Sequence, residues 1–135
     1  MKVSDYMSKD VVTANLRDGL RQTFYRMREN GIRHMPVLGD DEELVGVISD
    51  RDLRRPDWVD DEENVAHYYL LDNAHKVGDT MTRGPAVVGP EDDIQEAVTT
   101  LIKKRIGALP VVEENGRLVG ILSANDLLRA LHDHG

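Results

Sequence analysis

The pattern of hydrophobic and polar positions in the first 55 residues predicts three strands and two helices. Three short apolar runs stand between polar turns, which is typical of strands. A stretch between the first and second runs carries Leu20, Phe24, Met27 and Tyr25 at helical spacing, and Gly31 ends it as a left-handed cap. In order, we expect a helical turn at 3–7, a strand at 11–13, a helix from 18 to 30, strands at 35–38 and 44–48, and a helix after Ser49.

The same pattern returns 74 residues later. Residues 3–55 align on residues 77–129 without a gap, and 14 of the 53 positions are identical, where chance would give about three or four. Each half is therefore predicted to be β-α-β-β-α, and Pro90 or Asp92 is expected to cap the helix of the second half, whose apolar side includes Ile102. A half of this size buries too little surface alone, so we expect an α+β sandwich in which the two halves pack with pseudo-twofold symmetry.

The strongest match joins 46–52, Gly-Val-Ile-Ser-Asp-Arg-Asp, to 120–126, Gly-Ile-Leu-Ser-Ala-Asn-Asp. In each copy a strand ends on a serine and leads into a helix that carries an aspartate one turn along. Unpaired N–H groups at a helix start suit an anion, and a carboxylate accepts hydrogen bonds from a vicinal diol. The motif predicts a phosphate-and-ribose site in each half. A simpler alternative stays open, in which the serines are N-caps and the aspartates favour the helix dipole.

The residues around the two motifs differ in charge. Because a phosphate needs positive donors and arginine supplies a planar fork of them, the first half is predicted to be the better phosphate site. Arg83 or Arg105 could approach the second motif, depending on how the halves pack. The first half has Arg33, His34 and Arg51 where the second has Gly107, Ala108 and Asn125.

Composition narrows the class of protein. A net charge of −8 and a pI near 5.0 argue against nucleic-acid binding, which needs a basic surface. The absence of cysteine excludes disulfides and thiolate sites. No apolar run approaches a membrane span and the N-terminus is no signal peptide, so we expect a cytoplasmic protein that does not bind membranes.

The segment between the halves, residues 56–76, breaks the repeat and is predicted to be a helical linker. It has an acidic start suited to a helix N-terminus and three aromatic residues, Trp58, Tyr68 and Tyr69. These either pack against the first half or mark an oligomer contact. The predicted domains are therefore residues 1–55, 56–76 and 77–135.

Neither catalysis nor metal binding is expected. The chain contains no nucleophile elbow, phosphate loop or repeated carboxylate pair, and the repeat leaves no room for a further domain. A protein metal site needs about three or four convergent ligands, and the histidines form no compact cluster of that kind. Those considered are His67, His75, His132 and His134.

The element order, the Ile-x-x-x-Pro-Val strand and the Gly-x-x-Ser-x-x-Asp ending resemble a CBS domain, and two in tandem resemble a CBS pair, or Bateman module. The resemblance covers residues 3–55 and 77–131. The chain is similar to stand-alone CBS pairs, including acetoin-utilisation-type proteins, and to the regulatory inserts of IMP dehydrogenases. It implies a dimeric regulatory module that binds AMP, ADP or ATP, or in some members S-adenosylmethionine or NAD, in the clefts between its halves.

The resemblance also implies site residues. The ribose-binding aspartate corresponds to Asp52 and Asp126, and the hydroxyl that reaches the phosphate to Ser49 and Ser123. The base pocket is formed by the start of the second strand and by the first strand with the residue after it. Together with the cations, the predicted site is Val12, Thr13, Asn15, Arg33, His34, Met35, Pro36, Ser49, Arg51 and Asp52 in the first half, and Val87, Gly89, Ala108, Leu109, Pro110, Ser123, Asn125 and Asp126 in the second.

The predicted function is thus a non-catalytic sensor of an adenine nucleotide, AMP or ATP, that signals through a homodimer. Two alternatives remain: a structural module with degenerate pockets that binds an unidentified protein partner, and a sensor of S-adenosylmethionine or NAD. Nucleic-acid binding is a weaker third, because of the net charge.

Overall fold

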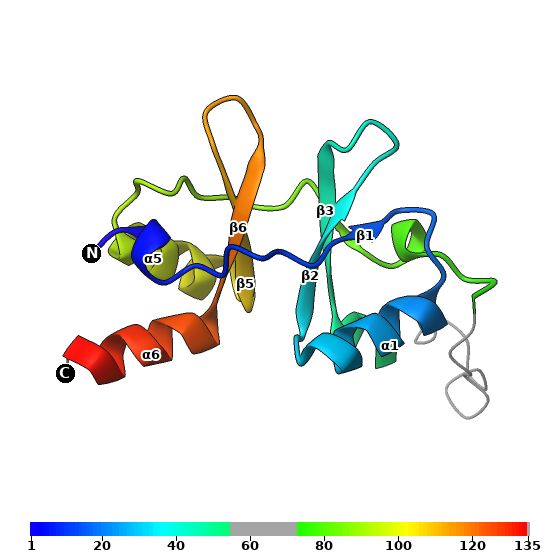
Figure 1. Ribbon diagram of the computed structural model, residues 1–135, viewed down its shortest axis with the longest axis horizontal. Helices are drawn as coiled ribbons and strands as arrows, with labels where there is room; N and C mark the ends of the chain where they lie inside the picture. Colours follow the sequence, from blue (N-terminus) through cyan, green and yellow to red (C-terminus); the bar gives the residue numbers. More distant parts are fainter. Residues whose placement is uncertain (55–72, 135) are drawn as a thin grey trace. The chain divides into compact units, whose positions relative to one another are not determined.

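A computed structural model describes residues 1–54 and 73–134 of the chain (Figure 1). The first half has the predicted strand–helix–hairpin–helix order after a short 3₁₀ turn. The second half repeats it, except that its predicted first strand is reduced to a single bridge at Val88. The elements of the first half are η1 (Val3–Asp5), β1 (Ala14–Asn15), α1 (Leu20–Asn30), β2 (His34–Leu38), β3 (Leu44–Ser49) and α2 (Asp50–Arg54). Those of the second are η2 (Val77–Asp79), β4 (Thr82–Arg83), α5 (Ile94–Lys104), β5 (Ala108–Val112), β6 (Leu118–Ser123) and α6 (Ala124–His134).

The chain divides into two compact units that do not follow the two sequence halves. One unit comprises Val12–Gly84, and the other comprises Met1–Val11 together with Pro85–Gly135; we call them the 12–84 unit and the 85–135 unit. The opening segment of each half therefore belongs to the unit built mainly from the other half. The predicted boundaries along the chain, 1–55 and 77–135, describe the repeat in sequence, whereas the compact units exchange these segments.

The exchanged segments extend both sheets at the same place. In the 12–84 unit the strand order is β1-β2-β3-β4, with β1 parallel to β2 and the other pairs antiparallel. Here β4, from the opening segment of the second half, lies along β3. In the 85–135 unit the β5–β6 hairpin forms a bridge from Val88 to Val111 on one side and from Ser8 to Ile121 on the other. Each hairpin is thus flanked by one segment from its own half and one from the other.

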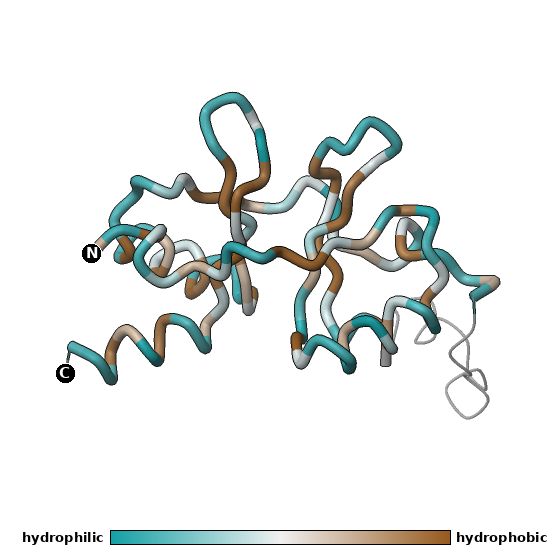
Figure 2. The backbone as a smooth tube through the Cα atoms, in the orientation of Figure 1, coloured by the Kyte–Doolittle hydropathy of each residue, from teal (hydrophilic) through white to brown (hydrophobic). Residues whose placement is uncertain are grey.

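Each unit has its own aliphatic core, and apolar residues concentrate in the strand pairs while the hairpin tips are hydrophilic (Figure 2). Val77 from η2 is fully buried in the core of the 12–84 unit, where it joins Met35 and Ile48. Val3 from η1 is equally buried in the core of the 85–135 unit, with Leu109 and Leu122. The exchanged turns are therefore core elements.

The structure corrects the starts of the first strands and of the helices. β1 begins at Ala14, not within 11–13, and of 86–88 only Val88 pairs, through a single bridge. The carboxylate of Asp18 accepts from the backbone N–H of Asn15, which makes a tight turn and delays α1 to Leu20. In the second half the same turn occurs, and Asp93 is the N-cap of α5, in place of Pro90 or Asp92.

Two predicted core residues are exposed. Tyr25 is 53% exposed and Ile102 is 71% exposed, because the buried stripe of each helix is narrower than the sequence pattern indicated. It consists of Leu20, Thr23 and Met27 in α1 and of the corresponding positions in α5. The aromatic part of the predicted linker lies outside the described residues. No helix in the described ranges is long and apolar enough to cross a membrane.

Gly46 is expected to tolerate no side chain. It lies in β3 opposite Val37, and a Cβ there would come within 2.6 Å of Met81 Sδ and 2.7 Å of the backbone oxygen of Thr82. The backbone oxygen has little freedom to yield, so Gly46→Ala should lower the free energy of unfolding by about 1–3 kcal/mol, as overpacked sites do. Urea denaturation measures this loss. Gly89→Ala, whose nearest neighbour would be 3.5 Å away, is the control, and equal stabilities of the two variants would contradict the close approach.

Candidate functional site

The charged and hydroxyl residues predicted in the first half gather at one end of the β2–β3 hairpin. His34 at the start of β2 lies opposite Ser49 at the end of β3. Beyond this pair, the backbone N–H of Asp50 donates to the carbonyl oxygen of Arg33 at 2.9 Å. Arg51 follows, exposed in the first turn of α2. The hairpin register therefore brings together residues that stand 15 to 18 positions apart in sequence.

Ser49 and Asp52 form a reciprocal capping box. The backbone N–H of Ser49 donates to Asp52 Oδ2 at 3.0 Å, and the backbone N–H of Asp52 donates to Ser49 Oγ at 3.1 Å. Each side chain thus satisfies a backbone donor of the other residue. Ser49 therefore caps α2, a role that is compatible with ligand binding, and the ribose role of Asp52 stays a prediction. Within residues 1–54 and 73–134, Asp52 Oδ1 accepts no hydrogen bond.

The second half repeats this geometry and adds a hydrogen bond between the side chains of Ser123 and Asp126. Ala108 lies opposite Ser123, and the backbone N–H of Ala124 donates to Gly107 O at 2.9 Å. Asp126 Oδ2 accepts from both the backbone N–H and the Oγ of Ser123, at 2.8 and 3.0 Å, and the Asp126 N–H donates to Ser123 Oγ at 3.2 Å. Asp126 is only 7% exposed. Asp126 therefore accepts more hydrogen bonds from its own capping serine than Asp52 does.

Arg129 is the residue that sequence reasoning missed. Its Nη2 lies 2.6 Å from Asp126 Oδ1, one helical turn away in α6. The only sequence signal was an arginine three positions after the aspartate, a spacing that places two side chains on one helix face. The second motif therefore does have a cation beside it. Arg83, in contrast, donates to Gly78 O within the 12–84 unit, and Arg105 is exposed at the C-cap of α5.

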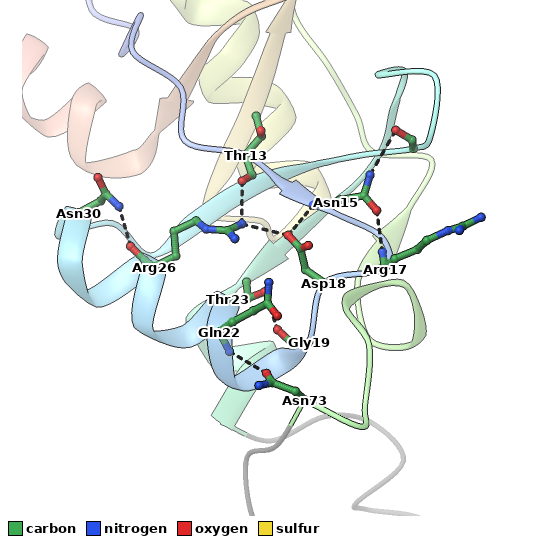
Figure 3. A network of polar contacts seen from close by, with 11 residues as sticks. Thr13, Asn15, Arg17, Asp18, Gly19, Gln22, Thr23, Arg26, Asn30 and Asn73 are labelled. Atoms are coloured by element: carbon green, nitrogen blue, oxygen red, sulfur yellow. Dashed lines mark hydrogen bonds and ion pairs between the residues drawn. The ribbon is translucent and has the colours of Figure 1, made fainter.

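The first-strand segment is divided between the two ends of the sheet. β1 runs parallel to β2, so Val12 and Thr13, which precede it, lie toward the end where β2 starts. Asn15 lies toward the opposite end. Its Oδ1 accepts from the backbone N–H of Arg17 at 2.9 Å, and its Nδ2 donates to Gly39 O at 3.5 Å (Figure 3). The structure therefore does not bring Asn15 to the His34–Ser49 end, and the same register applies to Gly89.

Arg26 fixes the first-strand segment in the first half only. Its Nη1 donates to the carbonyl oxygen of Thr13 at 3.1 Å and to Asp18 Oδ2 at 3.0 Å (Figure 3). At the corresponding position the second half has Thr100, whose hydroxyl donates within its own helix. The residue that corresponds to Thr13 is Val87, which is 43% exposed. The two halves thus present different groups at this position.

The remaining predicted residues are mostly core. Met35 and Leu109 are fully buried, each in the hydrophobic cluster of its own unit, and Pro36 and Pro110 are buried as well. Their side chains pack inward, which leaves only backbone groups for a ligand. Asn125 is exposed in the first turn of α6.

Beside this end of the hairpin the 12–84 unit has an open concave surface of about 550 Å³. Arg33 and Asp50 form part of its wall, so the predicted site and this hollow are continuous. Arg28 lies over the ring of Phe24, with 5.7 Å from its guanidinium carbon to the ring centroid. The lining residues are Phe24, Met27, Arg28, Gly31, Ile32, Arg33 and Asp50.

The environment of His34 lowers its pKa below the ordinary value of 6.5. Partial burial is the main cause, and Arg33 acts in the same direction, while the carboxylates of Asp50 and Asp52 oppose it. At neutral pH the imidazole is therefore uncharged, and it offers one donor and one acceptor nitrogen to a ligand. The fixed positive charges at this end of the hairpin come from Arg33 and Arg51.

This lowered pKa predicts a pH dependence of stability. Between pH 6.5 and the folded-state pKa, the unfolded chain binds more protons than the folded chain, so the free energy of unfolding should fall as pH decreases through this range. His34→Gln should remove that part of the slope in urea titrations, and His132→Gln, at an exposed position, is the control for losing an imidazole. An NMR titration that placed the pKa of His34 above 6.5 would reverse the sign.

The comparisons with known proteins identify the family and the fold. The family model described as CBS domain matches residues 3–56 and 77–133. A CBS domain-containing protein of Dictyostelium discoideum is 32% identical over 133 residues, which cover 96% of this chain and 90% of that protein. An inosine-5'-monophosphate dehydrogenase of Korarchaeum cryptofilum (strain OPF8) is 32% identical over 126 residues, 93% of this chain but only 23% of the enzyme. The crystal structure of CBSX2 in complex with AMP has a TM-score of 0.79 at 28% identity and covers 98% of this chain and 97% of its own.

Proposed function

Because the chain belongs to the CBS-domain family and carries two copies of its motif, we propose that it is a regulatory module that binds an adenine nucleotide, AMP or ATP, at the first-half motif. The observation that carries this proposal is the Asp52 carboxylate. One of its oxygens is held by the backbone of Ser49, and the other is open among the described residues. A carboxylate held in this way is oriented in advance to accept a diol.

The charges at the same end of the hairpin suit the rest of such a ligand. Arg33 and Arg51 are exposed and supply guanidinium groups for a phosphate. The neutral imidazole of His34 adds a donor and an acceptor without a fixed charge. A relative of known structure, CBSX2, was crystallised with AMP, which supports AMP as the first ligand to test.

The proposed action is regulation by differential affinity, without a chemical step. A ligand that binds one conformation more tightly than another shifts the population toward it. We assign the homodimer contact that would transmit this shift to α5 and α6, since Ile102 of α5 is 71% exposed and Leu128 and Leu131 of α6 are 64 and 69% exposed. Apolar side chains exposed together are typical of interfaces.

Calorimetric titration of the full chain with AMP, ATP, NAD and S-adenosylmethionine tests the proposal. We expect AMP or ATP to bind with a dissociation constant below about 1 mM, near −4 kcal/mol. Sedimentation of the same samples with and without ligand reports the oligomeric state. Absence of binding by all four ligands at millimolar concentration would exclude the sensor function. It would favour the second candidate, a protein-interaction module, which the exposed residues of α5 and α6 also suit.

A further inference from the structure

The aspartates of the two motifs differ in how many hydrogen bonds they already accept. Asp52 accepts one from within the described chain, from the Ser49 N–H. Asp126 accepts three: two at Oδ2, from the N–H and hydroxyl of Ser123, and one at Oδ1, from Arg129. The two motifs are alike in sequence, and within the described residues their aspartates differ in the hydrogen bonds they accept. Arg55, which aligns with Arg129, lies outside those residues.

This difference decides whether a vicinal diol can bind. A carboxylate has about four acceptor positions, two on each oxygen, and a diol donates two hydrogen bonds. Among the described residues Asp52 accepts a single hydrogen bond and has room for both hydroxyls, whereas Asp126 already accepts three and has about one position left. Arg129 donates to Oδ1, the oxygen of Asp126 that the capping box does not use. At 2.6 Å this bond is short even for a charge-assisted hydrogen bond.

From this geometry we infer that Arg129 closes the second-half motif to vicinal diols by occupying the Asp126 oxygen that the capping box leaves open. The inference rests on the proposed function, because it assigns the ligand selectivity of the same motif. Arg129 acts by occupying Asp126 and is a specificity-determining residue that needs no contact with the ligand. A ligand can use Asp126 only by displacing the guanidinium from a carboxylate side chain that is 9% exposed.

The position of Arg129 favours a removable block over a structural ion pair. Its own side chain is 60% exposed, so Arg129 can be replaced without opening a cavity in the core. The capping box of Ser123 and Asp126 uses Oδ2 and stays intact without Arg129. Replacement of the arginine should therefore free Oδ1 while the start of α6 keeps its cap.

The test isolates the second motif with Asp52→Ala, which removes the first-half acceptor, and then adds Arg129→Met. Calorimetry with AMP should show weak binding by Asp52→Ala and at least about tenfold tighter binding by Asp52→Ala/Arg129→Met, since hydrogen bonds to charged groups are strong. The gain should disappear with 2',3'-dideoxy-AMP, which lacks the diol. Asp52→Ala/Arg129→Lys, which keeps a charged donor, and Asp52→Ala/Arg117→Met, which removes an exposed arginine elsewhere in the unit, should bind as weakly as Asp52→Ala.

The outcomes separate the inference from the proposed function. If the parent binds AMP but Arg129→Met adds no affinity to Asp52→Ala, the inference is wrong and the sensor function stands. Weaker binding by the Arg129→Met pair also overturns it, because Arg129 would then hold the ligand. If neither the parent nor any variant binds AMP, both fail. Should Arg129→Met fold poorly, the parent decides: two AMP molecules per chain, both lost with 2',3'-dideoxy-AMP, would contradict a closed second motif.

Discussion

Replacement of Val3 by aspartate is expected to destabilise the 85–135 unit, which is built mainly from the second half of the sequence, although Val3 belongs to the first half. Val3 is fully buried among Leu109 and Leu122 of the 85–135 unit, and its backbone N–H donates to Asp92 O at 2.9 Å. The variant loses a buried valine and places a carboxyl group in an apolar core. Together these changes should cost about 3 kcal/mol or more of unfolding free energy.

Native-state hydrogen exchange locates this loss. In Val3→Asp, the amides of β5, β6 and α5 should lose protection before those of β2, β3 and α1. The mirror variant, Val77→Asp, should show the opposite order, because Val77 is buried in the core of the 12–84 unit. Ser8→Asp places the same carboxylate on the same segment at an exposed position and should stay close to the parent. Loss of protection confined to 12–54 in Val3→Asp would rule out the exchange of opening segments.

The sequence predicted the elements that local chemistry determines. The Ser-x-x-Asp spacing predicted the helix starts after the hairpins, and Gly31 adopts the expected left-handed conformation, with φ of 62°. The hairpins 34–49 and 108–123 follow from apolar runs and polar turns. These features depend on residues a few positions apart, so the pattern alone is sufficient.

The exchange of opening segments could not be predicted from the pattern. Val3 and Val77 occupy equivalent positions of a duplicated sequence, and each would bury equally well against either half. The periodicity is the same in both cases, so it contains no information about which copy receives which segment. Only the three-dimensional contacts of η1 and η2 decide it.

The sequence predicted only part of the residues that the structure brings together, because Asn15 and Gly89 lie toward the other end of the sheet. The motif placed Ser49 and Asp52 together, and the hairpin register added His34. What was missing is the number of hydrogen bonds each carboxylate already accepts. Arg129 is an ordinary surface arginine in sequence, and its effect depends on the burial of Asp126, which no single stretch of sequence reveals.

Asp52→Asn is expected to separate the two roles of this side chain. Asparagine keeps an oxygen that can accept from the Ser49 N–H, so the capping box at 3.0 Å survives. Its NH₂ group replaces the open carboxylate oxygen with a donor, which opposes the hydroxyls of a diol. Stability should therefore stay within about 0.5 kcal/mol of the parent, while AMP affinity falls at least about tenfold, since a hydrogen bond to a charged group contributes about 1.5–3 kcal/mol.

Asp52→Ala completes the comparison because it removes both roles. It should lose AMP binding and in addition about 1 kcal/mol of stability, as the loss of a cap does. Asp41→Asn, which removes one charge from the exposed turn between β2 and β3, is the control for net charge. Calorimetry with AMP and thermal unfolding without ligand measure the two effects separately. If Asp52 were only a cap, Asp52→Asn would bind AMP as the parent does and only Asp52→Ala would be impaired. If both variants lose AMP affinity and only Asp52→Ala loses stability, the carboxylate is the ribose acceptor.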